Sequence, residues 1–228
     1  MNTKTSANKN VQILYHILEM QQDIEKVHNL KVMLHRQQIT KLDYTNILAI
    51  KNMKHRLQKI YARVMIVSYM HKLFPNSKVC YTHGKLGEPL IFGPGNMQVS
   101  VSHSNNIIAV ALSQVNIGLD IEESRKLLPG VFSNYTKQEK NDVLNCDDIT
   151  YEFIRLWTCK EALLKKEKVG LTHGLKNSEI KSLDTRTAVN YRGTEKTIIY
   201  SQKIENYCLS LALDYDFASR NIIFSKYI

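Results

Sequence analysis

The chain has 228 residues, which is long enough to bury a hydrophobic core without disulfides or a structural metal. Hydrophobic residues make up 43% of it and charged residues 23%, with 9 Gly and 4 Pro, which excludes collagen-like, disordered and low-complexity proteins. The formal net charge is +10, and residues 1–100 hold 14 Lys and Arg against 5 Asp and Glu. This excess predicts a polyanionic partner: nucleic acid, an anionic membrane, a phosphorylated cofactor or an acidic protein surface.

The four cysteines show no C-x-x-C spacing, which argues against a zinc ribbon and against a disulfide framework. The first ten residues are polar, and no apolar run of signal-peptide or membrane-spanning length follows them. We therefore expect reduced thiols and a soluble, cytoplasmic protein. We also expect a monomer.

The first half of the chain predicts a strand followed by a long basic helix. Apolar residues alternate over 11–17, as on one face of a strand. Over 51–73 they recur at helical spacing and end before Pro75. The basic residues interleaved with them are Lys54, Arg56, Lys59 and Arg63.

Strands and helices alternate again after this helix. Short β-rich runs over 97–102, 107–112 and 115–121 predict a small antiparallel sheet. Thr136 and Glu139 have capping-box spacing, so a helix is expected from there to Leu144. A second helix is predicted over 150–166, ended by Gly170, and then a hairpin of 198–204 with 207–214 around Glu205 and Asn206. The pattern is α+β and occurs roughly twice.

Two carboxylates close one of the predicted strands. Asp120 and Glu122 point to the same side of the strand because side chains alternate along it. Oxygen ligands that converge in this way suit Mg²⁺. The alternative is that they are simply solvated acidic residues at a strand end.

The second helix carries a line of charged side chains. Glu161 and Lys165 are four residues apart and share one face. Glu161 could be a third carboxylate for the same metal, and Lys160 and Lys165 could reach phosphates. The alternative is a surface ion pair.

His103 follows a strand and is expected in a turn, where it can donate a hydrogen bond to a phosphate oxygen. The neighbouring Ser102 raises the alternative of a serine hydrolase. Adjacent residues in a strand point apart, however, and no G-x-S-x-G motif accompanies them. The other histidines show no H-E-x-x-H pattern, which argues against zinc.

Together these elements resemble one family, the Sfp-type (surfactin-synthetase-type) 4′-phosphopantetheinyl transferases, over roughly residues 84–171. Residues 87–90 resemble its G-K-P-x-L motif, 101–104 its x-S-H-S, 118–122 its G-I-D-I-E, and 156–165 its W-x-x-K-E-A-x-x-K. Each motif is weak alone, and their shared order makes chance improbable.

The resemblance implies a holo-[acyl-carrier-protein] synthase activity, in which a serine of an acyl or peptidyl carrier protein attacks coenzyme A and 3′,5′-ADP leaves. Coenzyme A would be the co-substrate, and its phosphates would make it the polyanionic partner that the basic residues predict. Asp120, Glu122 and Glu161 would hold Mg²⁺, Glu161 would also help to deprotonate the serine, and His103, Lys160 and Lys165 would contact phosphates. The residues that would bind coenzyme A are Arg56, Lys59, Gly87, Glu88, Pro89, Ser102, His103, Lys160 and Lys165.

The family also implies two similar α+β halves in a pseudo-two-fold arrangement, with coenzyme A and Mg²⁺ in the cleft between them. We expect the halves to be residues 1–114 and 115–228. Two departures from the family stand out. Glu88 replaces the usual Lys or Arg. The family's arginine-rich helix, whose cation binds the 3′-phosphate, is recognisable only as Lys54, Arg56, Lys59 and Arg63, of which Arg56 is the best single candidate.

Two other functions remain open at this point. A nucleic-acid-binding module without catalysis would explain the basic first half, and it would need exposed aromatic residues among the basic ones. A transferase-like protein that has lost activity is the other, although the intact carboxylate trio argues against it. Under the transferase hypothesis we expect no nucleic-acid or membrane partner, and the sequence does not name the carrier protein or the tolerance for acylated coenzyme A.

Overall fold

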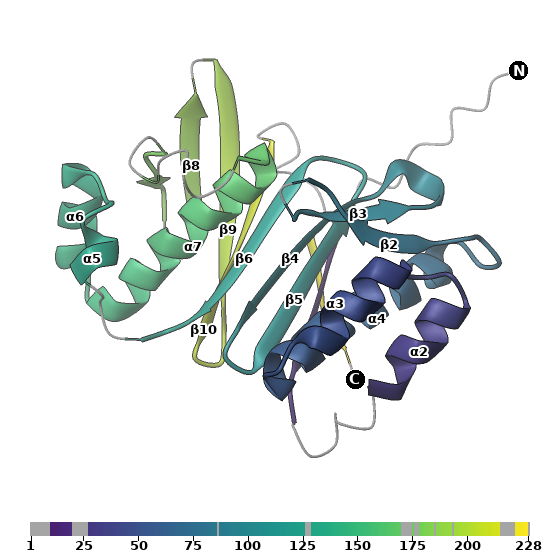
Figure 1. The fold of residues 1–228 in the computed structure, drawn as a ribbon. Coiled ribbons are helices and arrows are strands. Elements are labelled where there is room, and N and C mark those ends of the chain that lie inside the picture. Colours follow the sequence, from purple (N-terminus) through teal and green to yellow (C-terminus); the bar gives the residue numbers. More distant parts are fainter. Residues whose placement is uncertain are drawn as a thin grey trace, which may run out of the picture.

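The computed structural model describes residues 10–19, 27–85, 87–125, 129–169, 175, 178–184, 186–192, 194–214 and 222–227 (Figure 1). The strands are β1 (Val11–Ile17), β2 (Cys80–His83), β3 (Pro89–Phe92), β4 (Gln98–Ser104), β5 (Ile107–Ser113), β6 (Ile117–Glu123), β7 (Lys181–Ser182), β8 (Thr187–Arg192), β9 (Glu195–Ile204), β10 (Tyr207–Asp214) and β11 (Ile222–Lys226). The helices are α2 (Val27–His35), α3 (Lys41–Ala49), α4 (Met53–Leu73), α5 (Pro129–Phe132), α6 (Lys137–Leu144) and α7 (Ile149–Glu167), with a 3₁₀ turn at Pro94–Asn96.

The first sheet has the strand order β11-β1-β5-β4, and α4 packs on it. The predicted strand over 11–17 is confirmed as β1, which pairs antiparallel with β5 and parallel with β11. The predicted basic helix is confirmed as α4, which begins where the side chain of Asn52 accepts the His55 N–H. Its apolar face packs against β5, and α2 and α3 lie beside it (Figure 1).

The second sheet has the order β6-β10-β9-β8-β7, and α7 crosses it over β6 and β10. The predicted hairpin is confirmed, since β9 and β10 pair antiparallel around Glu205 and Asn206. Gly118 in β6 permits the close approach of α7. A Cβ added there would lie 1.9 Å from the carbonyl oxygen of Ala162, so a larger residue would push the helix away.

The third strand of the predicted small sheet belongs elsewhere, so this part of the prediction is wrong. β4 and β5 pair antiparallel as expected, but β6 is an edge strand of the second sheet. β6 nevertheless lies beside β4, because serine side chains of β4 take the place of backbone hydrogen bonds between the two strands. The Ser100 hydroxyl accepts the Leu119 N–H at 2.9 Å, and the Ser104 hydroxyl accepts the Glu123 N–H at 3.1 Å. These serines join the two sheets.

The α+β prediction is confirmed, since each sheet carries one long helix (Figure 1). The expected division at residue 114 falls in the turn between β5 and β6, where the chain passes from the first sheet to the second. β11 does not follow this division, because it returns to the first sheet beside β1. None of the helices in the described part of the chain has the length and apolarity needed to cross a lipid bilayer.

The ends of the helices in the second half follow local signals. α6 begins with the expected capping box of Thr136 and Glu139. α7 ends at Lys168, which has a left-handed conformation with φ 55° and donates its backbone N–H to the last turn. The predicted stop at Gly170 lies outside the described residues. The helix therefore ends before the glycine that was expected to stop it.

Thr136→Ala is expected to lower the free energy of unfolding by about 1 kcal/mol, the usual cost of losing such a cap. The Thr136 hydroxyl accepts the Glu139 N–H at 3.2 Å, and alanine leaves this donor without its partner. Urea unfolding measures the change. Thr45→Ala is the control, because Thr45 is exposed within α3 and alanine favours the helix. Equal stability of Thr136→Ala and the parent would contradict the assignment of the cap.

Candidate active site

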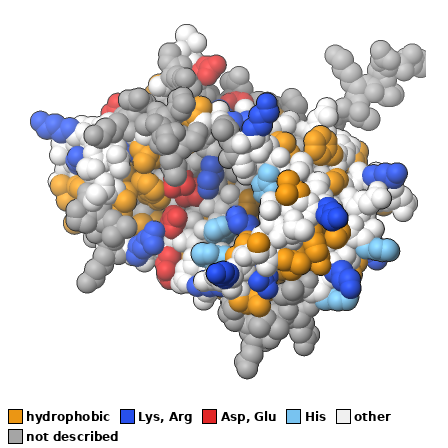
Figure 2. All heavy atoms as spheres, viewed as in Figure 1, with side chains coloured by type: hydrophobic (Ala, Val, Ile, Leu, Met, Phe, Trp, Pro, Cys, Tyr) orange, Lys and Arg blue, Asp and Glu red, His pale blue; other side chains and the backbone are white. Residues whose placement is uncertain are grey.

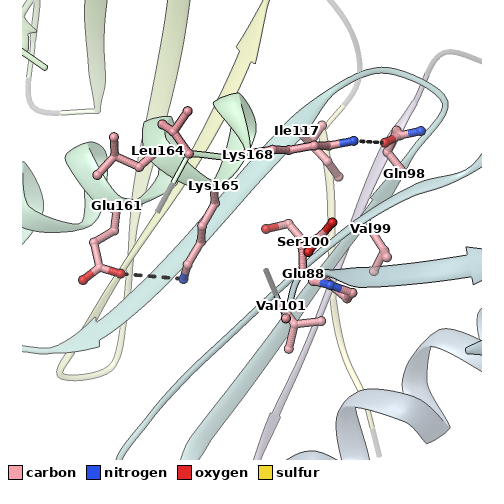
Figure 3. Close-up of a pocket in the computed structure, with 13 residues that line it drawn as sticks. Glu88, Gln98, Val99, Ser100, Val101, Ile117, Glu161, Leu164, Lys165 and Lys168 are labelled. Atoms are coloured by element: carbon pink, nitrogen blue, oxygen red, sulfur yellow. Dashed lines mark hydrogen bonds and ion pairs between the residues drawn. The ribbon is translucent and has the colours of Figure 1, made fainter. Parts of the chain in front are cut away.

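A cavity of about 310 Å³ opens between α7, β4 and the start of β6 (Figure 3). Its volume is in the range of small-molecule sites. The predicted cofactor-binding residues Gly87, Glu88 and Pro89 line it, and Gly87 has φ +81°, a conformation that favours glycine. The remaining lining residues are Gln98, Val99, Ser100, Val101, Ile117, Glu161, Leu164, Lys165, Lys168 and Val169.

Asp120 and Glu122 lie on the same side of β6, as the alternation predicted, and both face serines of β4. The Ser102 hydroxyl donates to Asp120 Oδ1 at 2.7 Å, and the Ser104 hydroxyl donates to Glu122 Oε2 at 2.7 Å. Asp120 is buried, with a side chain 2% exposed. The two carboxylates are therefore oriented by β4 and are not simply solvated.

Lys165 reaches across from α7 to these groups. Its Nζ lies 2.6 Å from Asp120 Oδ1, 3.1 Å from the Ser102 hydroxyl and 3.9 Å from Glu161 Oε2. Figure 3 shows Glu161 and Lys165 side by side on the helix, with a dashed line between them. The predicted i,i+4 pair thus exists, but it faces the second sheet's edge strand and β4. It is not an isolated surface pair.

The carboxylates form a crowded, partly buried group. Burial raises the pKa of Glu161 to about 7, and the negative charges of Asp120 and Glu122 add to the increase. Burial also raises the pKa of Glu122. Asp120 Oδ2 is a buried oxygen with no hydrogen-bond partner among the described residues. Each of these observations indicates that another cation would be stabilised here.

The donor atoms of Asp120, Glu122 and Glu161 are carboxylate oxygens, the type of ligand that Mg²⁺ prefers. Within the described ranges, no group of three or more His, Cys, Asp or Glu side chains is close enough to hold a metal ion as arranged. Mg²⁺ commonly takes only one or two carboxylates and completes its shell with waters and substrate phosphates. The unpartnered Asp120 Oδ2 supplies one such ligand, so a preformed trio is not required.

Lysine and histidine side chains of α4 and β4 lie close enough to act on one another near the candidate site. His103 lies within β4 and not in the predicted turn, and its ring centroid is 6.4 Å from that of His55. Burial, and to a smaller extent the positive charges of Lys59, His55 and Lys165, lower the pKa of His103 to about 4, so its imidazole is neutral near pH 7. Figure 2 shows acidic side chains beside basic and histidine side chains near the middle of this face. Such a group is suited to an anion.

His55 was not among the site residues predicted from the sequence. The available signal was its position four residues before Lys59, which puts both side chains on one face of α4. Ser102 and His103 diverge as neighbours in a strand do, since Ser102 bonds Asp120 while His103 faces His55. This separation gives no support to a serine hydrolase.

Two arginines of α4 are engaged by the protein itself. The Arg56 guanidinium donates to the carbonyls of Ile50 and Leu48 at the end of α3, at 2.7 and 3.0 Å. Arg63 is buried and pairs with both carboxylate oxygens of Asp43. Lys59 differs, because its charge acts on both His103 and Lys165. Of Arg56, Lys59 and Arg63, Lys59 is therefore the one that interacts electrostatically with residues of the candidate site.

Lys160 lies apart from the other candidate residues, so its predicted contact with phosphates does not fit its position. Its side chain is fully buried, and Nζ pairs with Glu139 Oε1 at 2.8 Å and donates to the carbonyls of Leu175 and Ser178. The physical reason is helical geometry. Five residues separate Lys160 from Lys165, about 140° around the helix axis, so the two side chains leave opposite faces.

The comparisons with known proteins agree with this geometry. Residues 116–212 match the sequence model of the family described as the 4′-phosphopantetheinyl transferase superfamily. This range contains Asp120, Glu122, Glu161 and Lys165.

Three curated relatives show the same similarity. The 4′-phosphopantetheinyl transferases Sfp and ffp of Bacillus subtilis are each 27% identical over 110 residues, 47% of this chain and 49% of theirs. The transferase psf-1 of Bacillus pumilus is 25% identical over 117 residues, 49% of this chain and 50% of its own. The match spans about half the length of these relatives. Residues 116–212 therefore resemble the Sfp-type 4′-phosphopantetheinyl transferases, as the sequence motifs indicated.

Proposed function

We propose that this protein transfers the 4′-phosphopantetheine group of coenzyme A to a serine hydroxyl of an acyl or peptidyl carrier protein and releases 3′,5′-ADP. The observation that carries the proposal is the contact of Lys165 with Asp120 and Glu161 at the edge of the cavity. All three residues lie in the range that matches the superfamily. The relatives named above support the same activity.

The charged residues around Lys165 and those around Lys59 would bind different phosphates of coenzyme A. Lys165 would contact the diphosphate, because its side chain lines the cavity and its ammonium lies 2.6 Å from Asp120 Oδ1. Lys59, His55 and His103 would bind a further phosphate, since a bound anion would offset the neighbouring positive charges and favour the protonated form of His103. The cavity of about 310 Å³ that Gly87 and Pro89 help to line would take part of coenzyme A.

Mg²⁺ held by Asp120, Glu122 and Glu161 would supply positive charge to the phosphoryl group as it is transferred. The Glu161 carboxylate accepts the proton of the carrier serine. The serine oxygen forms a bond to the β-phosphorus, and the bond from that phosphorus to the bridging oxygen breaks. The bridging oxygen leaves with 3′,5′-ADP. Ser102 and Ser104 hold the carboxylates of β6 in place throughout.

The test is to incubate the protein with coenzyme A, Mg²⁺ and a panel of apo carrier proteins and to measure the mass of each. A gain of one phosphopantetheinyl group with equal release of 3′,5′-ADP is the expected result, and it requires Mg²⁺. No transfer to any carrier, together with tight binding to nucleic acid, would favour the binding-module alternative. Tyr61, the aromatic residue among the basic residues 54–63, is buried, which disfavours that alternative.

Lys59→Ala is expected to raise the KM for coenzyme A about tenfold with little change in kcat, because a distal phosphate is bound equally in the ground and transition states. Arg56→Ala, the variant that the sequence favoured, is expected mainly to lower the melting temperature, since Arg56 holds the end of α3. Steady-state kinetics and thermal unfolding measure both. A larger increase in KM from Arg56→Ala than from Lys59→Ala would indicate that Arg56, and not Lys59, binds the 3′-phosphate.

A further inference from the structure

Lys168, at the end of α7, has a backbone conformation that a lysine rarely adopts. Its φ and ψ are 55° and 32°, and its N–H donates to the carbonyls of Leu164 and Lys165. Glycine is the usual residue at such a helix end, because any side chain is strained there. A lysine therefore costs free energy at this position that a glycine would not. Its side chain is where a compensating role should be sought.

The side chain of Lys168 crosses the mouth of the cavity. Lys168 is exposed, lines the cavity, and donates from Nζ to Gln98 Oε1 of β4 at 3.1 Å. Figure 3 shows this contact spanning from the end of α7 to β4. Lys165 lies three residues earlier on the same side of the helix, a rise of about 4.5 Å. The two ammonium groups thus border the same cavity at different depths.

Lys168 differs from the other lysines of this region in its partner. Lys160 pairs with Glu139, Lys165 with Asp120 and Lys166 with Asp214. In the described part of the chain, no carboxylate lies within ion-pair distance of Lys168, whose partner is the neutral amide of Gln98. Exchange of this amide for a phosphate oxygen would give a stronger, charge-assisted hydrogen bond.

The cavity lining carries two acidic and two basic side chains, so an anion there would depend on the lysines. Glu88 and Glu161 also line the cavity, and both would repel a phosphate. Lys165 is already shared between Asp120 and Glu161. Lys168 is the second cation of the lining, and its charge is not offset by a nearby acidic partner in the described structure.

We propose that Lys168 is a further binding residue for the diphosphate of coenzyme A and acts together with Lys165. The inference rests on the proposed function, since that function supplies the ligand. Lys168 is three residues after Lys165 and directly follows α7, so both long side chains can reach one diphosphate once Lys168 leaves Gln98. Lys168 leaves Gln98 when the ligand binds, and the left-handed backbone at the end of α7 directs its side chain to the mouth.

The test measures the Kd of coenzyme A and of dephospho-coenzyme A by calorimetry, with Mg²⁺ present, for the parent and four variants. Lys168→Gly and Lys168→Asn keep the left-handed backbone and remove the charge, so both should bind each ligand about tenfold more weakly. Lys168→Arg should retain most of the affinity. Lys72→Gln removes an exposed lysine at the end of α4 and should change nothing.

Thermal unfolding separates binding from stability. Lys168→Gly should melt at the same or a higher temperature than the parent, because glycine relieves the strained conformation. An unchanged Kd in Lys168→Gly would overturn the inference while leaving the proposed function intact. A loss seen with coenzyme A but not with dephospho-coenzyme A would also overturn it, since the contact would then be to the 3′-phosphate. Failure of the parent to bind coenzyme A would overturn the proposed function itself.

Discussion

Glu161→Gln is expected to lower the turnover number at least about a hundredfold, roughly 2.7 kcal/mol of barrier, with little change in melting temperature. Glutamine keeps the size and the helix propensity of glutamate but removes the charge that would hold Mg²⁺ and the oxygen that would accept the serine proton. Glu161 is partly buried at the cavity edge, and its charge is already disfavoured by Asp120 and Glu122. The fold therefore gains no stability from this charge that would be lost with it.

The measurement is the initial rate of holo carrier formation at saturating coenzyme A, alongside thermal unfolding. Asp147→Asn is the matched control, because Asp147 is exposed and distant from the residues of the site in the sequence. It should leave both quantities unchanged. Normal turnover in Glu161→Gln combined with a lower melting temperature would show that Glu161 is a structural residue and that the active site has been misplaced.

Lys160→Met is expected to lower the free energy of unfolding by about 3–5 kcal/mol, because it leaves a buried carboxylate without its counter-charge. Glu139 and Lys160 are both fully buried, and their ion pair links α6 to α7. Glu139 also accepts the backbone N–H groups of Thr136 and Ile180, so its carboxylate is fixed in place. It has no route to water when the lysine is removed.

Urea unfolding measures this loss, and the double variant Lys160→Met with Glu139→Gln is the control. Removing both charges should cost less than the sum of the single changes, because no unpaired charge then remains. The Kd of coenzyme A measured on folded Lys160→Met should match the parent. A stable Lys160→Met that binds coenzyme A weakly would instead support the phosphate contact that the family resemblance implies.

Local signals in the sequence determined much of the secondary structure. The capping box of Thr136 and Glu139, the helical spacing of α4 and α7, and the β9–β10 hairpin all depend on residues close together in the chain. The alternation of β6 likewise put Asp120 and Glu122 on one side. These features follow from the geometry of one strand or helix and need no knowledge of its neighbours.

Only the tertiary structure decided which elements meet and which charged groups face the site. No local pattern shows that β6 leaves the sheet of β4, that β11 returns to β1, or that serines of β4 hold the carboxylates of β6. The sequence likewise does not show which basic residues lie at the site. Lys59 and Lys165 reach the site while Arg56, Arg63 and Lys160 are held by the protein's own carbonyls and carboxylates. The sequence does not distinguish a lysine or arginine that binds a ligand from one that pairs with a buried group of the protein. The difference depends on long-range packing.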